Sequence, residues 1–353
     1  MCNDLFNQHL KSVMDFHFSA DTGTPFWLKK KTNLGFDPLI DINSFDDLRL
    51  FPDISEELKH IDVRELIPKG LEKFSDLGVF ESGGTTGRPK KIVVFNEWLN
   101  LLVDWRCEKM LQPKINKSKD YLAVIPTGPH IVGEINRRRA LKLGGLFFSI
   151  DLDPRWVKRM IQAKENDVVE QYSSHLIEQL ENIVSTQDIG YLVITPPLLE
   201  KIARNSLLVK KLNDSLQQII WGGTQMNQDV LLYLQENIFP NVPISASYGN
   251  TMVLGEGCAR LNETYDGMPI FDSFSPNIIF DVRDLNNCLE SATYGSRGRV
   301  FMHHITKYAF FPNIKERDTA IRLARNDNLI GDAVSKVEPV SVFGGVEVIE
   351  GVY

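Results

Sequence analysis

Apolar residues recur with two different periods along this chain. Between residues 5 and 16 they occupy one helical stripe, which predicts an opening helix that packs on the body of the protein. Residues 44–47, Ser-Phe-Asp-Asp, resemble a capping box and predict a short helix that Pro52 ends. From residue 79 onward the pattern becomes regular, because short apolar runs alternate with longer amphipathic stretches.

The short apolar runs predict strands at residues 77–81, 92–94, 121–125, 146–151, 191–195, 218–221, 244–247, 277–282 and 299–303. The amphipathic stretches predict helices at residues 97–111, 131–143, 154–164 (capped by Asp153), 174–186, 197–204 and 229–238. Because strands alternate with helices, we expect an α/β fold in which helices flank a mostly parallel sheet. In such sheets ligands bind at the loops that follow the carboxyl ends of the strands.

Composition narrows the classes of function. The 353 residues are 43% hydrophobic and 24% charged, which is typical of a folded globular protein. The 46 acidic residues outnumber the 39 basic ones, and this balance argues against a nucleic-acid-binding protein. Four dispersed cysteines, no signal-peptide pattern and no apolar run of membrane-spanning length lead us to expect a cytoplasmic protein without a membrane partner.

The most informative segment is residues 82–90, Ser-Gly-Gly-Thr-Thr-Gly-Arg-Pro-Lys. Its glycines allow backbone N–H groups to turn toward an anion, its hydroxyls add donors, and its lysine supplies a positive charge. A Walker A loop fits poorly, because Arg88 and Pro89 separate the last glycine from the lysine. The alternative is an ordinary surface loop. We predict a polyphosphate site made by Ser82, Gly83, Gly84, Thr85, Thr86, Gly87 and Lys90.

This segment resembles the phosphate loop of the adenylate-forming superfamily, which includes acyl- and aryl-CoA ligases. Four later segments resemble the motifs of that superfamily in the same order: residues 127–133, 221–224, 247–251 and 316–319. The last of them is similar to the variant found in phenylacetate-CoA ligases. The resemblance implies the large N-terminal, AMP-binding lobe of that fold, and ATP or AMP as the nucleotide.

The resemblance also implies roles for single residues. His130 and Gly133 would border the acyl pocket, and Trp221, Gly222, Gly223 and Thr224 would line the adenine and acyl sites. Tyr248 and Gly249 would cover the adenine, Thr251 would meet the phosphate, and Asp318 would accept the ribose hydroxyls. Lys90, Thr251 and His130 would be the catalytic residues. Each motif alone has an ordinary structural explanation, such as a turn or a strand end.

The chain departs from the superfamily pattern at two places. Met252 occupies the position of a glutamate that helps hold Mg²⁺, and Glu256 is a substitute only if the intervening segment is helical. The tail after residue 343 resembles only the start of the region beyond the hinge. We therefore expect a lobe at residues 1–330, a hinge remnant at residues 331–353, and no mobile C-terminal domain.

The resemblance implies ATP-dependent activation of an aromatic carboxylic acid, such as a phenazine carboxylate, to an acyl-adenylate in antibiotic biosynthesis. A downstream reductase or another acyl-acceptor protein would then receive the acyl group. Two alternatives stay open: a catalytically impaired protein that binds or carries an aryl acid, and an aryl-CoA ligase.

Two further clusters carry weaker signals. His303 and His304 lack the rest of an acyltransferase signature, and alternation along a strand places one imidazole inward and the other outward. Residues 137–139, Arg-Arg-Arg, predict a solvated helix face. Alternatively, because they follow the acyl-site segment, one of these arginines steers an anionic substrate.

Overall fold

The computed structural model describes residues 2–72, 77–82, 88–110, 118–343 and 346–347. Its centre is one sheet of eleven strands in the order β10-β11-β12-β13-β9-β8-β7-β6-β5-β3-β4. These strands are β3 (Asp120–Ile125), β4 (Phe147–Asp151), β5 (Ile189–Ile194), β6 (Gln218–Trp221), β7 (Ile244–Asn250), β8 (Gly255–Tyr265), β9 (Met268–Ser273), β10 (Ile278–Arg283), β11 (Arg297–Ile305), β12 (Phe310–Leu323) and β13 (Ala333–Pro339). Two small antiparallel pairs are β1 (Leu77–Glu81) with β2 (Lys91–Phe95), and β14 (Val342–Phe343) with β15 (Val346–Glu347).

The helices are α1 (Cys2–Phe18), α2 (Pro25–Lys30), α3 (Asn96–Met110), α4 (Ile131–Lys142), α5 (Pro154–Gln162), α6 (Asn166–Thr186), α7 (Pro196–Ile202), α8 (Ser206–Ser215) and α9 (Gln228–Tyr233). Shorter helical turns are η1 (Lys31–Asn33), η2 (Asp46–Leu50), η3 (Glu57–Lys59), η4 (Val63–Leu66), η5 (Lys69–Leu71), η6 (Leu234–Ile238) and η7 (Thr251–Val253). The described helices include none that is both long and apolar enough to cross a lipid bilayer.

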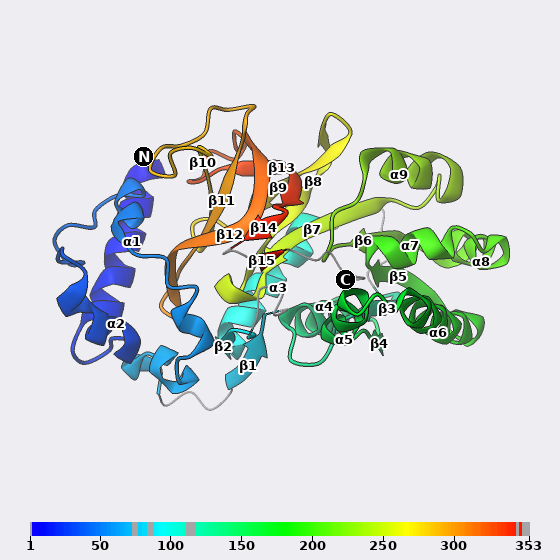
Figure 1. Cartoon of the computed structure of the whole chain (residues 1–353), viewed down its shortest axis with the longest axis horizontal. Coiled ribbons are helices and arrows are strands. Elements are labelled where there is room, and N and C mark those ends of the chain that lie inside the picture. Colours follow the sequence, from blue (N-terminus) through cyan, green and yellow to red (C-terminus); the bar gives the residue numbers. More distant parts are fainter. Residues whose placement is uncertain (1, 73–76, 83–87, 111–117, 344–345, 348–353) are drawn as a thin grey trace.

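One half of the sheet is parallel. Strands β4, β3, β5, β6 and β7 pair side by side in the same direction. Every residue of β5 and of β6 is buried, and apart from Gln218 these strands carry no polar amide or charged side chain. Figure 1 shows α4 to α9 gathered around this half of the sheet. The predicted α/β fold class is confirmed, and Asp153 caps α5 by accepting hydrogen bonds from the backbone N–H groups of Arg155 and Trp156.

The other half of the sheet is antiparallel, and it begins where β8 turns back along β7. The sequence pattern did not reveal β8, β9, β12 or β13, because these strands mix polar and apolar residues. In β12, for example, Lys315 and Arg317 are only half-buried. Helix α8 was also missed. Strand β13 lies beyond residue 330, the predicted domain boundary, and pairs with both β12 and β9.

The N-terminal helices lie against the antiparallel half, at the opposite end of the molecule from α6 and α8 (Figure 1). Helix α1 packs on the body as predicted, because its His17 imidazole is within 2.7 Å of the carbonyl oxygen of Thr306. The indole N–H of Trp27 donates a 2.8 Å hydrogen bond to the carbonyl of Phe310. In the predicted capping box, the Asp47 carboxylate accepts from the backbone N–H of Ser44 at 2.8 Å, and the helix that follows is a single 3-10 segment.

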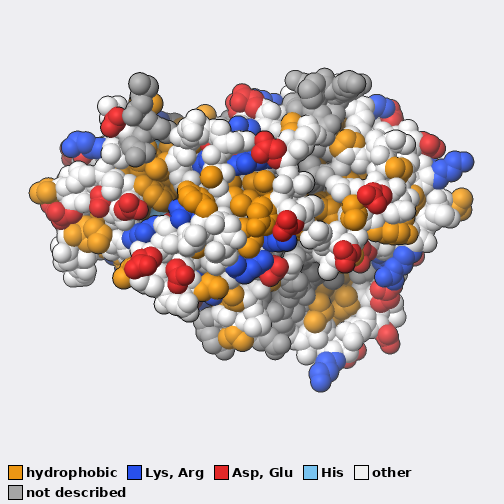
Figure 2. Space-filling model, turned by 90° about the horizontal axis from the view of Figure 1, so that it is seen from above, with side chains coloured by type: hydrophobic (Ala, Val, Ile, Leu, Met, Phe, Trp, Pro, Cys, Tyr) orange, Lys and Arg blue, Asp and Glu red, His pale blue; other side chains and the backbone are white. Residues whose placement is uncertain are grey.

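The expectation that one imidazole of His303 and His304 faces outward was wrong, and the expected solvated face of residues 137–139 holds for Arg137 but not for Arg139. His303 and His304 are both buried, because elements cover both faces of β11; His304 lies 2.6 Å from the carbonyl oxygen of Val253. Arg139 is completely buried, while Arg137 is exposed and pairs with Glu134. On the face seen in Figure 2, acidic and basic side chains are interspersed.

Candidate functional site

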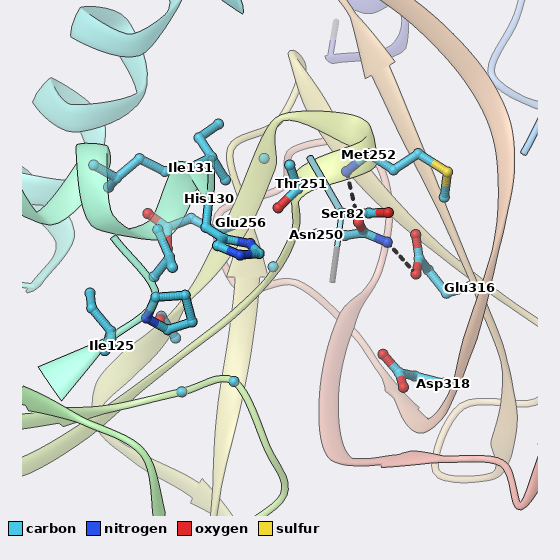
Figure 3. Close-up of a pocket in the computed structure, with 18 of the residues that line it drawn as sticks. Ser82, Ile125, His130, Ile131, Asn250, Thr251, Met252, Glu256, Glu316 and Asp318 are labelled. Atoms are coloured by element: carbon cyan, nitrogen blue, oxygen red, sulfur yellow. Dashed lines mark hydrogen bonds between the residues drawn. The ribbon is translucent and has the colours of Figure 1, made fainter. Parts of the chain in front are cut away.

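A cavity of about 250 Å³ lies where the sheet changes from parallel to antiparallel, and the predicted motifs meet in it. Strands β3, β5, β6, β7, β8 and β12 and the start of α4 all contribute residues. In Figure 3, Ile125 and His130 lie on one side and Glu316 and Asp318 on the other. The predicted site residues that line it are Ser82, Lys90, His130, Trp221, Gly222, Gly223, Gly249, Thr251, Glu256 and Asp318.

Ser82 and Lys90 join the two ends of the predicted phosphate loop. The backbone N–H of Ser82 donates to the carbonyl of Lys90 at 3.0 Å, and the backbone N–H of Lys90 donates to the Ser82 hydroxyl at 3.0 Å. Arg155 secures the strand before the loop by a 2.6 Å ion pair with Glu81. The predicted phosphate-binding residues Gly83, Gly84, Thr85, Thr86 and Gly87 lie outside the described residues.

Lys90 lies near the buried carboxyl group of Glu316 on β12. Burial lowers the pKa of Lys90, while the negative charge of Glu316 opposes that shift. Burial, and secondly the charge of Asp318, raise the pKa of Glu316 to about 8. Glu316 accepts a 2.5 Å hydrogen bond from the side-chain amide of Asn250, and its Oε1 has no hydrogen-bond partner in the described part of the chain.

Glu316 is a site residue to which the sequence analysis gave no role. The spacing of the two carboxylates could have predicted it, because Glu316 and Asp318 are two positions apart on a strand and therefore face the same side. It was missed because β12 was not predicted as a strand. Asn250, which holds Glu316, also accepts from the backbone N–H of Met252 at 2.7 Å and so fixes the turn after β7 (Figure 3).

A second cavity of about 110 Å³ adjoins the first, and Tyr248 and Asp318 line it together. The Tyr248 hydroxyl donates a 3.0 Å hydrogen bond to Oδ2 of Asp318. Burial raises the pKa of Tyr248 far above its ordinary value, with the charge of Asp318 as the second cause. Other predicted residues that line this cavity are Trp221, Gly223, Thr224 and Gly249.

Two polar atoms in the wall of this second cavity are shielded from solvent and have no hydrogen-bond partner among the described residues. They are the indole N–H of Trp221 and the hydroxyl of Thr224. A shielded polar atom without a partner is energetically costly, so a ligand that hydrogen-bonds there lowers the free energy of the site. A purine base and a ribose carry such groups, and the residues present therefore fit a nucleotide.

The predicted glycines differ in what they do. Gly249 lets β8 approach β7, because a Cβ there would lie 2.7 Å from the Cβ of Glu256 and 2.8 Å from the carbonyl oxygen of Gly255. Gly133, predicted to border the acyl pocket, lies within α4, where a Cβ would meet the Cα of Thr127 at 2.7 Å. It therefore allows α4 to approach the preceding loop, and it is not among the residues that line either cavity.

His130 precedes α4 as its N-cap residue and lies in the wall of the first cavity. Burial lowers the pKa of its imidazole, and the positive charge of Arg155 lowers it further. The neutral imidazole is therefore favoured. Apolar side chains surround this part of the cavity, including those of Ile125, Ile131 and Val193.

The segment from Met252 to Glu256, where the sequence predicted a metal site if the segment were helical, is not a continuous helix. One 3-10 turn, η7, ends at Leu254 in a left-handed conformation, and β8 begins at the next residue. Glu256 therefore lies on a strand, where it pairs with Arg106 at 3.2 Å, and Met252 is buried. Within the described ranges, no three His, Cys, Asp or Glu side chains cluster as metal ligands. Because Mg²⁺ is often bound by one or two carboxylates together with substrate phosphates, Glu316 and Asp318 also fit it.

Comparisons with known proteins find similar structures, although no family model and no curated protein matches the sequence. The chain is similar to a 2-hydroxyisobutyryl-CoA ligase with a bound acyl-AMP, at a TM-score of 0.63 and 12% identity, over 92% of this chain and 64% of that chain. A structure of the same ligase with acyl-AMP and CoA is similar at a TM-score of 0.62 and 14% identity, over 95% of this chain and 67% of that chain. A luciferase-like enzyme of the mealworm Zophobas morio is similar at a TM-score of 0.50 and 15% identity, over 83% of this chain and 63% of that chain.

These likenesses establish the fold. The chain has the architecture of acyl-CoA and other adenylate-forming ligases, as the motifs predicted, and it spans about two thirds of the length of the 2-hydroxyisobutyryl-CoA ligase. At 12–15% identity the comparison concerns the fold alone.

Proposed function

We propose that this chain binds ATP and forms the adenylate of a carboxylic acid. The observation that carries the proposal is the convergence of five sequence motifs, spread over residues 82–319, on two adjoining cavities. Lys90, Thr251 and the β12 carboxylates line the first cavity, and Tyr248 and Asp318 line the second. This arrangement provides separate places for the phosphates, the nucleoside and the acid.

In the proposed reaction a carboxylate oxygen of the acid attacks the α-phosphorus of ATP. The bond from that phosphorus to the bridging oxygen breaks, and pyrophosphate leaves with the electron pair. Lys90 stabilises the negative charge on the phosphates, and Thr251 supplies a hydroxyl beside them. Asp318, held by Tyr248, accepts the ribose hydroxyls. Catalysis of this kind is positioning and charge stabilisation. Mg²⁺ held by Glu316 would neutralise phosphate charge.

An aromatic acid fits the proposed acyl side of the cavity. Trp221 provides an aromatic wall and Ile125 and Val193 provide apolar walls, while neutral His130 stands at its border. Phenazine and benzoic-type carboxylates are the members of this class that we propose to test. The activated acyl group would pass to a reductase or another acceptor protein. CoA is a second candidate acceptor, since the similar 2-hydroxyisobutyryl-CoA ligase was solved with CoA.

A carrier that binds an aryl acid without activating it is the second candidate function. The buried Met252, at the place of the superfamily's metal-binding glutamate, favours it. The paired Tyr248 and Asp318 and the half-buried Lys90 favour the enzyme, because a carrier needs no nucleotide site.

Calorimetric titration with ATP, together with acid-dependent exchange of labelled pyrophosphate into ATP, distinguishes the adenylating enzyme from the carrier. The enzyme binds ATP and exchanges pyrophosphate, and Asp318→Asn weakens both. Asp229→Asn, on the exposed start of α9, is the matched control. A folded chain that binds an aryl acid but neither ATP nor pyrophosphate is a carrier. A chromatographic search for a thioester in the same reactions identifies CoA as an acceptor.

A further inference from the structure

The wall of the first cavity that α4 and β8 form contains two buried polar side chains. Asn136 on α4 and Glu256 on β8 both line the cavity. Figure 3 shows Glu256 on the same side as His130 and away from the carboxylates of β12. Because we assign the nucleotide to the side of β12, this wall lies where the part of the acid remote from the activated carboxylate would bind.

The amide of Asn136 offers an acceptor and not a donor. Its Nδ2 donates a 2.8 Å hydrogen bond to the carbonyl oxygen of Val132, one turn earlier on α4. A carbonyl oxygen can only accept, so this bond fixes which end of the amide is nitrogen and which is oxygen. The remaining atom, Oδ1, has no hydrogen-bond partner in the described part of the chain. A buried acceptor of this kind is costly until a donor reaches it.

Glu256 supplies a second acceptor. Its carboxylate pairs with Arg106, with 3.2 Å between Oε1 and Nε, yet Oε1 has no hydrogen-bond partner among the described residues. The side chain is 9% exposed, and because Glu256 lines the cavity, a ligand can reach that exposed part. Burial raises the pKa of Glu256, while the positive charges of Arg106 and Arg139 oppose the rise and favour the ionised form. An ionised carboxylate only accepts hydrogen bonds.

The charges around Glu256 select the kind of donor that fits this wall. The guanidinium groups of Arg106 and Arg139 both act on this one carboxylate, so its negative charge is already compensated. An ammonium group on the acid would therefore gain no net attraction, and a second carboxylate would meet two acceptors and no donor. A neutral O–H or N–H group satisfies an acceptor without bringing another charge into the protein interior.

We propose that the acid bound in this cavity carries a neutral hydrogen-bond donor, a hydroxyl or a ring amino group, on the part of the molecule remote from the activated carboxylate. The inference rests on the proposed function, and it narrows the aromatic acids to hydroxyaryl and aminoaryl carboxylic acids. The donor gives its hydrogen to the Glu256 carboxylate. Oδ1 of Asn136 accepts the second hydrogen of an amino group or the hydrogen of a further hydroxyl.

The test compares acids with and without the donor in calorimetric titrations without ATP. The probes are benzoic acid and its hydroxy, amino and methoxy derivatives, substituted at ring position 3 or 4; the methoxy group keeps the oxygen and removes the donor. At least one hydroxy- or aminobenzoate should bind about ten-fold more tightly than both benzoate and the methoxybenzoate substituted at the same position, since a hydrogen bond to a charged group contributes a factor of this size. Donor-bearing acids that bind no more tightly than benzoate, or than their methoxy counterparts, overturn the inference.

Glu256→Gln tests whether the carboxylate is the acceptor. The substitution keeps the size of the side chain and exchanges a charged acceptor for a neutral one, so the preference for the donor-bearing acid should fall about three-fold or more. Benzoate binding should not change. Glu263→Gln is the matched control, because it makes the same substitution at an exposed position of β8, and Glu263 lines neither cavity.

Asn136→Leu covers the case in which Glu256→Gln does not fold. Leucine keeps the branched shape of the side chain and removes Oδ1, so the preference should again fall about three-fold or more. Asn213→Leu is the control, because Asn213 also donates to the carbonyl oxygen four residues earlier on its helix and lines neither cavity. A full preference in both folded variants overturns the inference, and if neither variant folds, the comparison of the probes on the wild type decides it.

These outcomes are separable from the fate of the proposed function. Pyrophosphate exchange supported equally by benzoate and by its hydroxy and amino derivatives contradicts the donor and keeps the adenylation chemistry. A preference for the donor-bearing acid that depends on Glu256, in a chain that does not bind ATP, keeps the donor and removes the enzyme. A chain that binds ATP but none of the probe acids overturns both this inference and the aromatic class of the proposed acid.

Discussion

The hydroxyl of Tyr248 on β7 donates a 3.0 Å hydrogen bond to the carboxylate of Asp318 on β12, across 70 positions of sequence. The bond fixes the orientation of the carboxylate that we propose accepts the ribose hydroxyls. The Tyr248 ring packs against Phe280, with 5.5 Å between ring centres, so the tyrosine is itself held in place.

Tyr248→Phe keeps the ring and removes the hydroxyl. We expect AMP and ATP affinity to fall about two- to ten-fold, because a hydrogen bond of this kind contributes roughly 0.5–1.5 kcal/mol. Binding of the acid should not change. Calorimetric titration measures both, with Tyr233→Phe on the exposed face of α9 as the control. Nucleotide affinity equal to that of the wild type would show that the hydroxyl does not position Asp318.

Lys90→Ala should weaken ATP and pyrophosphate binding by ten-fold or more and leave acid binding unchanged. The reason is that a charge-assisted contact contributes roughly 1.5–3 kcal/mol, and we assign Lys90 to the phosphates alone. Lys91→Ala is the matched control, since Lys91 is the next residue and its side chain is exposed. A folded Lys90→Ala variant that binds ATP normally removes the phosphate assignment.

Glu316 predicts a pH dependence of stability. Its folded pKa of about 8 lies above its ordinary value of 4.5, so between these values the folded state holds a proton that the unfolded state has lost. The stabilisation is complete below pH 4.5 and is lost as the pH rises through 8, by at most about 1.4 kcal/mol per pH unit.

Urea unfolding of the wild type and of Glu316→Gln at pH 5, 6.5 and 8 tests this dependence. The free energy of unfolding of the wild type should fall relative to that of the variant as the pH rises. Shifts at other buried groups, such as Asp332, are common to both proteins and cancel in the difference. A difference that stays constant across the three pH values contradicts the assignment.

Gly249→Ala should lower the free energy of unfolding by about 1–3 kcal/mol, because the added Cβ overpacks the β7–β8 pair. Gly128→Ala is the control, since a Cβ at Gly128 meets nothing within 4 Å. Urea unfolding measures both variants. If the two substitutions prove equally mild, the close approach of the strands is not what requires glycine at residue 249.

The strands of the parallel half were predictable, whereas β8, β9, β12 and β13 of the antiparallel half were not, for a physical reason. Buried strands such as β5 are apolar throughout, whereas β12 changes its environment along its length. Its first residues, from Phe310, are buried, and Arg322 near its end is partly exposed. Such a strand shows neither a continuous apolar run nor a clean alternation.

The residues of the candidate site also divide into those that the sequence predicted and those that it did not. Residues in motifs with a fixed order, such as Lys90 and Asp318, were predicted, and they meet at one cavity. Glu316 and Arg139 were not given their places, because burial of a charged residue depends on which distant elements cover it. The sequence around Arg139 is that of an exposed helix face, but in the fold β3 and β6 bring Tyr121 and Gln218 against it.

Strand β12 also connects the N-terminal region with the first cavity. At its start, the carbonyl of Phe310 accepts the indole N–H of Trp27 from the N-terminal region, and six residues later Glu316 lines the cavity. At the rise of an extended strand this is a distance of about 20 Å. A substitution at Trp27 that lets the start of β12 shift would displace the carboxylates of the site. Its signature in a screen would be weakened nucleotide binding caused by a residue that never touches the nucleotide.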